Sequence, residues 1–231
     1  MGQDIKLKAA DGTEFSAYKA VPEGGRGPGL LVIQEIFGVN SHIRSVVDIY
    51  AQLGFVALAP DVFFRIKPGL NIGYSEKEMQ EGFSYYEKTD FDVARDDLAH
   101  VVQEMKGMPE VIAKVGSVGY CMGGNLSYRL ACKNAVDAAV AYYGGGVDAV
   151  ADRAAQLKTP LMMHFGEKDG HISAEAVEKM KKALAEKRDA SVLVYAGADH
   201  GWCVKGNQVY NEAAAEKAWG ELLGLYKRAL V

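Results

Sequence analysis

The chain has few cysteines, and their spacing is not that of a disulfide framework or a metal site. Its 231 residues contain three, Cys121, Cys132 and Cys203. An odd number at irregular spacing predicts neither a disulfide framework nor paired C-x-x-C metal ligands. The sequence also lacks the H-E-x-x-H pattern of zinc enzymes. We therefore expect no metal and no cofactor, and a cytoplasmic protein whose cysteines stay reduced.

Long apolar runs and blocks of basic residues are missing as well. No apolar stretch reaches the roughly 20 residues of a membrane-spanning helix, and the N-terminus lacks the apolar segment of a signal peptide. The 26 Lys and Arg residues are outnumbered by 30 Asp and Glu, a net charge of −4. This balance argues against nucleic-acid and membrane partners. We expect a small-molecule partner and a monomer.

What the chain does contain is a regular alternation of strand and helix patterns. Alternating residues on both sides of Asp11-Gly12 predict an antiparallel hairpin, and residues 24–29 predict a loop. Buried strands are predicted at 30–36, 55–60 and 115–120, and a strand followed by a loop in each of 135–145, 160–169 and 191–202. Helices are predicted at 41–53, 75–88, 91–106, 122–133, 173–187 and 211–230. Ser41 is the expected N-cap of the first helix, and Ser75 with Glu78 forms a capping-box pattern. The pattern predicts one domain, 1–231, with a mostly parallel central sheet, helices on both faces and an antiparallel N-terminal edge hairpin.

One cysteine lies among glycines directly after a predicted strand, in "GSVGYCMGGNL" (116–126). Gly119-Tyr120-Cys121-Met122-Gly123 fits the G-x-S-x-G nucleophile elbow with cysteine in place of serine. A sharp strand-to-helix turn needs small neighbours, and a helix N-terminus favours a thiolate. The Met122 N–H is then one oxyanion donor, and we expect the Ile36 N–H to be the second.

An acid and a base are needed beside such a nucleophile, and later strand ends supply them. Glu167 and Asp169 follow one strand, and His200 follows the next. The order nucleophile, acid, base is that of the α/β-hydrolase fold. From the residues alone either carboxylate is a candidate for the acid, and His171 is a second candidate for the base. His164 has the position of a core histidine, and Cys132 and Cys203 are expected to be structural.

Five segments together resemble the dienelactone hydrolase (carboxymethylenebutenolidase) family. They are "QEIFGVN" (34–40), "GSVGYCMGG" (116–124), "YYGGG" (142–146), "HFGEKDGHI" (164–172) and "GADHGW" (197–202). The resemblance implies an α/β-hydrolase fold and hydrolysis of a small lactone or ester through an acyl-thioester. It implies a triad of Cys121, Asp169 and His200. It also implies that Glu35 contacts the resting thiol and takes part in forming the thiolate, although Glu35 is alternatively a strand-end carboxylate paired with Arg44.

The resemblance is weaker at the substrate pocket. Characterised family members hold a substrate carboxylate with arginines, whereas "EKEMQEGFSYY" contains none and Lys205 is the only cation shortly after His200. Arg65 is a substitute whose place the sequence does not define, and a lysine lacks the planar fork of arginine. The side chains expected to line the pocket are Phe37, Tyr86, Tyr143, Trp202 and Lys205. The alternatives are an esterase or thioesterase for neutral acyl substrates and a non-catalytic thiol sensor.

Overall fold

The computed structural model describes residues 2–231, and the chain divides into two compact units. One unit extends to Ser117 and the other covers Val118–Val231. Strand β5 (Val111–Tyr120) contains the boundary between them. The single domain expected from the sequence stays a prediction.

The first unit is built on four further strands. They are β1 (Gln3–Lys8), β2 (Glu14–Ala20), β3 (Gly27–Ile33) and β4 (Val56–Pro60). β1 pairs antiparallel with β2, β2 antiparallel with β4, and β4 parallel with β3. The predicted hairpin around Asp11-Gly12 is confirmed, and Gly12 takes a φ of 84°. The apolar run Leu30–Ile33 is fully buried, as is typical of a parallel strand covered on both faces.

The start of β3 corrects the predicted loop at 24–29. β3 begins at Gly27, whose N–H donates to the Glu110 carbonyl at 3.0 Å. A Cβ at Gly27 would lie 2.0 Å from the Gly54 carbonyl oxygen, so only glycine fits there. The strand ends at Ile33, which places residues 34–36 beyond it rather than inside it.

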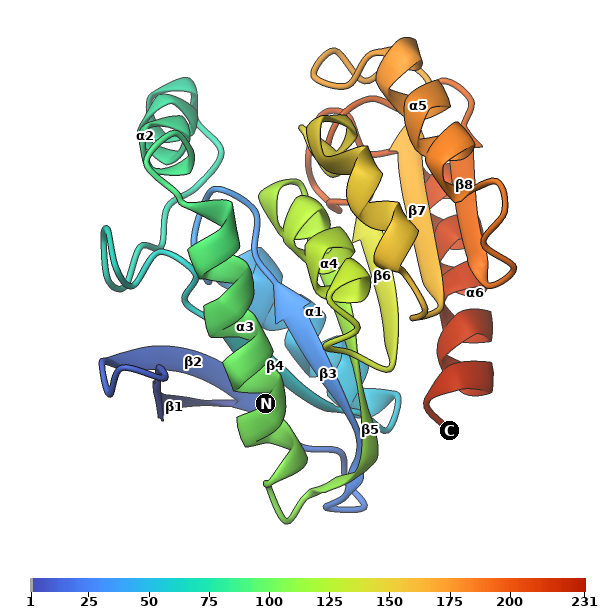
Figure 1. Ribbon diagram of the computed structural model, residues 1–231. Helices are drawn as coiled ribbons and strands as arrows, with labels where there is room; N and C mark the ends of the chain where they lie inside the picture. The colour runs from blue at the N-terminus through green and yellow to red at the C-terminus, as the bar shows by residue number, and fades with distance from the viewer. Residues whose placement is uncertain (1) are drawn as a thin grey trace. The chain divides into compact units, whose positions relative to one another are not determined.

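Three helices complete the first unit: α1 (Ser41–Gln52), α2 (Glu76–Tyr86) and α3 (Phe91–Lys106). Figure 1 shows α3 in front of β3 and β4, with α1 behind them. The N-cap of α1 is Asn40, whose side chain accepts from the Ile43 N–H, so the expected cap at Ser41 was wrong by one residue. The capping box of Ser75 and Glu78 at α2 is confirmed.

The second unit has a parallel arrangement throughout. β6 (Ala138–Tyr142) pairs with β7 (Leu161–Gly166), and β7 pairs with β8 (Ala190–Tyr195), each in parallel. Its helices are α4 (Met122–Cys132), the 3₁₀ helix η1 (Val147–Gln156), α5 (Ala174–Leu184) and α6 (Glu212–Ala229). Figure 1 shows α4 and α5 in front of these strands and α6 behind them. The sequence did not predict η1. The carboxyl ends of β5 to β8 lead into the loops that carry the predicted chemistry.

Candidate active site

The predicted nucleophile elbow is present as a strained turn. Cys121 lies between Tyr120 at the end of β5 and Met122 at the start of α4, with φ 53° and ψ −116°. A non-glycine residue at positive φ is held there only by its surroundings. A Cβ at Gly119 would lie 1.9 Å from the Gly123 carbonyl oxygen, so the close approach across the turn requires glycine.

The same turn places the thiol at a helix N-terminus. The Cys121 carbonyl accepts from the N–H groups of Gly124 and Asn125, at 2.9 and 3.2 Å. Met122 is the first residue of α4, where a backbone N–H has no acceptor inside the helix. The Met122 N–H and the helix dipole favour negative charge at this end of α4. The arrangement suits a thiolate and a developing oxyanion.

A buried carboxylate holds the predicted base. The Asp169 Oδ2 lies 2.9 Å from the His200 Nδ1, and the Asp169 side chain has no exposed area. The other oxygen, Oδ1, accepts from the His171 N–H at 2.9 Å. The carboxylate therefore has a fixed direction, and it orients the imidazole through Nδ1.

The structure distinguishes the two carboxylates that are candidates for the acid by their hydrogen-bond partners. Asp169 contacts the His200 ring, whereas the Glu167 Oε2 accepts from the Gly197 N–H at 2.8 Å. Glu167 thus joins its own loop to the loop that carries His200. His171, the alternative base, is exposed, and its ring lies 4.9 Å from the His200 ring.

The electrostatics of His200 follow from these neighbours. Burial lowers its pKa, but hydrogen bonds to Asp169 and Cys121 and the charges of both groups outweigh burial and raise the pKa from 6.5 to about 10. The imidazole is therefore positively charged at neutral pH, between the side chains of Cys121 and Asp169. An imidazolium beside Cys121 stabilises negative charge on the sulfur.

Two of the predicted pocket residues lie inside the protein. Tyr143 and Trp202 have no exposed area, and the Tyr143 ring lies 4.9 Å from the His200 ring. The Tyr143 hydroxyl is 3.0 Å from the Cys203 Sγ. Lys205 is exposed on the loop after His200. The sequence analysis did not predict the contact between Tyr143 and Cys203. The one available signal was that Cys203 follows His200 by three residues.

The remaining predicted site residues belong to the first unit. Glu35 is 3% exposed, and its Oε2 accepts from the Tyr74 hydroxyl at 2.9 Å. Ile36 and Phe37 are buried, and Tyr86 at the end of α2 is half-buried. The roles expected for these residues stay predictions.

The two arginines considered in the sequence analysis have acidic partners. The Arg44 Nη2 lies 2.8 Å from Asp4, and Arg65 pairs with Asp97 at 2.7 Å and with Asp11 at 2.8 Å. An arginine that is already engaged by carboxylates is less available to a substrate carboxylate.

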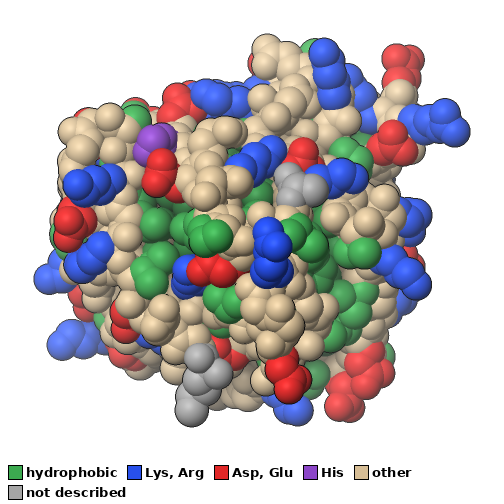
Figure 2. Space-filling model, turned by 90° about the horizontal axis from the view of Figure 1, so that it is seen from below, with side chains coloured by type: hydrophobic (Ala, Val, Ile, Leu, Met, Phe, Trp, Pro, Cys, Tyr) green, Lys and Arg blue, Asp and Glu red, His purple; other side chains and the backbone are tan. Residues whose placement is uncertain are grey.

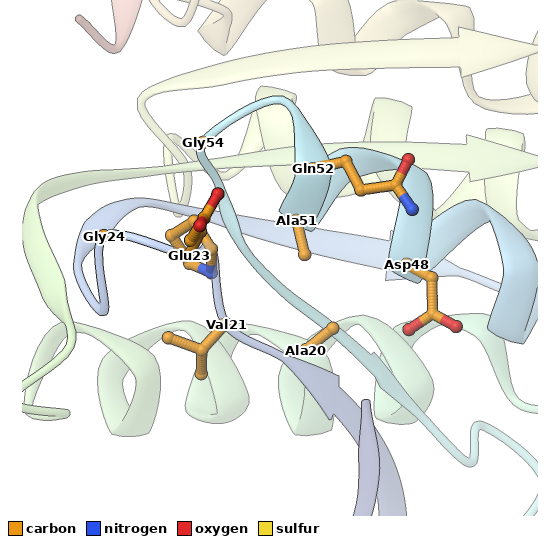
Figure 3. A pocket seen from close by; sticks show the side chains of 9 residues that line it. Ala20, Val21, Glu23, Gly24, Asp48, Ala51, Gln52 and Gly54 are labelled. Carbon is orange, nitrogen blue, oxygen red and sulfur yellow. The ribbon is translucent and has the colours of Figure 1, made fainter. Parts of the chain in front are cut away.

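The first unit also contains an open cavity of about 590 Å³. It is lined by Ala20, Val21, Pro22, Glu23, Gly24, Asp48, Ala51, Gln52 and Gly54. Figure 3 shows these side chains, among them the carboxylates of Glu23 and Asp48. None of the predicted site residues lines this cavity, and its lining contains no thiol, hydroxyl or imidazole. Its size therefore does not identify it as the reaction site.

Two further properties concern cofactors and membranes. Within residues 2–231, no three His, Cys, Asp or Glu side chains are grouped so that they could hold a metal ion. Over the same residues, no helix combines the length and apolar character needed to cross a membrane.

Comparison with known proteins identifies the family. The model of the dienelactone hydrolase family matches residues 15–230. The chain belongs to the dienelactone hydrolase family. It is 36% identical to a relative from Azospirillum brasilense, over 98% of this chain and 99% of that one. It is 30% identical to the carboxymethylenebutenolidase of Pseudomonas sp. (strain P51), over 98% of this chain and 95% of that one.

Solved structures show the fold. A crystal structure from Klebsiella pneumoniae subsp. pneumoniae MGH 78578 matches with a TM-score of 0.84 and 29% identity, over 98% of this chain and 99% of that one. The α/β hydrolase GrgF from Penicillium sp. sh18 matches with a TM-score of 0.74 and 15% identity, over 100% and 99%. The predicted α/β-hydrolase fold is confirmed, and the family is one of ester or lactone hydrolases.

Proposed function

We propose that this dienelactone hydrolase family member is a cysteine-dependent hydrolase of small lactones or esters that forms an acyl-thioester intermediate. One observation carries the proposal. Within the second unit, a strained cysteine at the N-terminus of α4 interacts with a histidine whose other ring nitrogen lies 2.9 Å from a buried aspartate. This combination provides a nucleophile, an acid–base group and an orienting charge.

The reaction begins with attack of the Cys121 thiolate on the ester carbonyl carbon. The carbonyl electrons move onto oxygen, and the Met122 N–H stabilises the oxyanion. When the oxyanion collapses, the carbon–oxygen bond to the alcohol breaks, and the His200 imidazolium gives its proton to the departing oxygen. In a lactone this oxygen stays attached to the acyl chain, so ring opening leaves one product on the thiol.

Hydrolysis of the thioester uses the imidazole that the first step has made neutral. His200 takes a proton from water, the hydroxide attacks the acyl carbon, and the Cys121 thiolate leaves. The sum consumes one ester and one water and yields an acid and an alcohol. The thiolate–imidazolium pair is restored, so Asp169 again faces a positive ring.

The family resemblance supports two further roles. We propose that the Ile36 N–H is the second oxyanion donor and that Glu35 takes part in forming the thiolate. Glu35 is buried and bonded to the Tyr74 hydroxyl, which gives its carboxylate a defined direction within the first unit. Phe37 and Tyr86 are proposed pocket residues on the same basis.

The test is replacement of the proposed nucleophile. Cys121→Ala should abolish turnover of p-nitrophenyl acetate and of a dienelactone, and Cys121→Ser should retain little activity because the site favours a thiolate. Cys132→Ala is the matched control, since burial raises the pKa of the Cys132 thiol to about 11 and makes it unreactive. Near-normal turnover by Cys121→Ala contradicts the mechanism. A reactive thiol without multiple turnover in the unmodified enzyme indicates the sensor alternative.

Lys205 tests the charge of the substrate. If Lys205 binds a substrate carboxylate, Lys205→Ala should raise KM for a dienelactone by about 2–5-fold, the cost of one exposed charge contact. KM for neutral p-nitrophenyl esters should stay unchanged. A KM that Lys205→Ala leaves unchanged for both substrates favours the general esterase or thioesterase alternative.

The proposed partner is a small ester or lactone. On the face in Figure 2, Lys and Arg side chains are interspersed with Asp and Glu, unlike the basic surface that binds polyanions. We propose a monomer in the cytoplasm, where a reducing environment keeps Cys121 a thiol.

A further inference from the structure

A two-residue corner at the end of β6 contacts both the nucleophile and the base. The Cys121 N–H donates to the Tyr142 carbonyl at 3.1 Å. The ring of the next residue, Tyr143, lies 4.9 Å from the ring of His200, inclined by 60°. Tyr143 has no exposed area, and no step of the proposed mechanism uses its hydroxyl.

The corner is held tightly from two directions. Tyr143 has a φ of 36°, unusual for a residue with a side chain, and its N–H donates to the His164 carbonyl at 2.7 Å. A Cβ at Gly124 in α4 would lie 2.4 Å from the Tyr142 carbonyl oxygen. Close packing against β7 and α4 therefore maintains a strained backbone at this position.

The hydroxyl of Tyr143 reaches the loop that carries the base. Its oxygen is 3.0 Å from the Sγ of Cys203, three residues after His200. The same loop is anchored by the buried Trp202, whose carbonyl accepts from the Asn211 N–H at 2.9 Å. One side chain thus contacts the imidazole ring and, through Cys203, the loop that carries it.

We propose that Tyr143 is a positioning residue that holds His200 in its reactive orientation, through the ring against the imidazole and through the hydroxyl on Cys203. The proposal rests on the proposed function. It replaces the expectation that Tyr143 lines the substrate pocket. A small displacement of an acid–base group is enough to slow a reaction strongly, which is the effect that Tyr143 prevents.

The ring also bears on the charge of His200. The groups that face the imidazole are Cys121 from the start of α4, Asp169 and His171 from the β7–α5 loop, and Tyr143 from the end of β6. An aromatic ring centred 4.9 Å away is within the distance at which a ring attracts a cation. Tyr143 therefore favours the imidazolium form, in addition to holding its direction.

Substitutions separate the two contacts. Tyr143→Leu removes both and should lower kcat by about 100-fold with a smaller change in KM. Tyr143→Phe keeps the ring and should lower kcat by about 2–10-fold, the worth of one hydrogen bond. Cys203→Ala should lower kcat as much as Tyr143→Phe does. Cys203→Ser can still form a hydrogen bond with the Tyr143 hydroxyl and should lower kcat less. The double variant Tyr143→Phe with Cys203→Ala should be no slower than either single variant.

A control and a second readout distinguish positioning from general destabilisation. Tyr195→Phe removes a tyrosine hydroxyl that bonds to the His164 Nδ1 at 2.8 Å, and it should leave kcat unchanged. NMR titration of His200 should show a lower pKa in Tyr143→Leu and an unchanged pKa in Tyr143→Phe. If Tyr143→Leu does not fold, the kcat values of Tyr143→Phe and Cys203→Ala still test the proposal.

The proposal is overturned if the Tyr143 and Cys203 variants turn over as fast as Tyr195→Phe. It is also overturned if the pKa of His200 is the same in Tyr143→Leu and in the unmodified enzyme. Failure of the proposed function looks different, since the unmodified enzyme would then show no turnover of esters or lactones while the NMR titration would still report on Tyr143.

Discussion

Two histidines of the second unit, one inside β7 and one on the loop after β8, have opposite electrostatic properties. His164 is fully buried and bonded to the Tyr195 hydroxyl at 2.8 Å, and burial lowers its pKa to about 3. The side chain of His200 is 19% exposed, and its pKa is raised to about 10. The two rings belong to one aromatic cluster, because Tyr142 stacks on His164 and adjoins Tyr143, which contacts His200.

The difference lies in the partners rather than in the burial. Burial removes water from both rings and disfavours the charged form. A neutral hydroxyl does not compensate for this loss, so His164 is a neutral core residue. The carboxylate of Asp169 and the thiol of Cys121 do compensate at His200. The histidine with the raised pKa therefore lies on a loop after a strand, and the histidine with the lowered pKa lies inside a strand.

The largest effect is expected from removing the negative charge beside His200. Asp169→Asn keeps the shape of the side chain but removes its charge and allows the wrong tautomer of His200. It should lower kcat by about 10³–10⁴-fold, measured with p-nitrophenyl acetate. Glu167→Gln is the matched control, because an amide oxygen still accepts from the Gly197 N–H, and its kcat should stay within about threefold. Equal losses in the two variants would contradict the assignment of Asp169.

A second experiment tests the thiolate–imidazolium pair. Cys121→Ala removes the hydrogen bond and the charge that raise the pKa of His200, so this pKa should fall from about 10 towards 6.5. NMR titration of the imidazole carbons measures it, with the pKa of His164 as an internal reference. An unchanged His200 pKa would show that Asp169 alone keeps the ring protonated.

The smallest expected effect is on stability, and its sign differs for the two histidines. The folded-state pKa of His200 is raised, so its contribution is complete below pH 6.5 and is lost as the pH rises towards 10. The folded-state pKa of His164 is lowered, so the unfolded chain binds a proton that the folded protein does not, and stability falls as the pH drops from 6.5 towards 3.

Urea unfolding over a pH series measures both contributions. Between pH 6 and 4 the unmodified protein should lose about 1.4 kcal/mol more per pH unit than His164→Phe, which has no proton to bind there. Cys121→Ala should lose less stability than the unmodified protein between pH 7 and 10. Parallel pH profiles for His164→Phe and the unmodified protein would contradict a neutral His164.

Much of this arrangement could be predicted from the sequence, because it depends on local patterns. The glycines around Cys121 predict the elbow, and Ser75 with Glu78 predicts the start of α2. Both features involve residues close together in the chain, whose steric and hydrogen-bonding requirements follow from their residue types.

The parts that could not be predicted depend on contacts between distant segments. Asp169 and Glu167 are two residues apart on one loop, and only the path of the His200 loop decides which one meets the imidazole. The sequence predicts Tyr143 as a pocket residue, because it is an aromatic at a strand end. Its contact with Cys203 joins residues 60 positions apart, which no local pattern encodes.

The most direct test of the central claim is to trap the acyl group. The enzyme is mixed with p-nitrophenyl acetate, quenched in acid within the first turnover, and digested for peptide mass spectrometry. We predict an acetyl group on Cys121 that disappears as turnover is completed and is absent from Cys121→Ala. Turnover without an acyl group on Cys121, or a stable acyl group on another residue, would contradict the account.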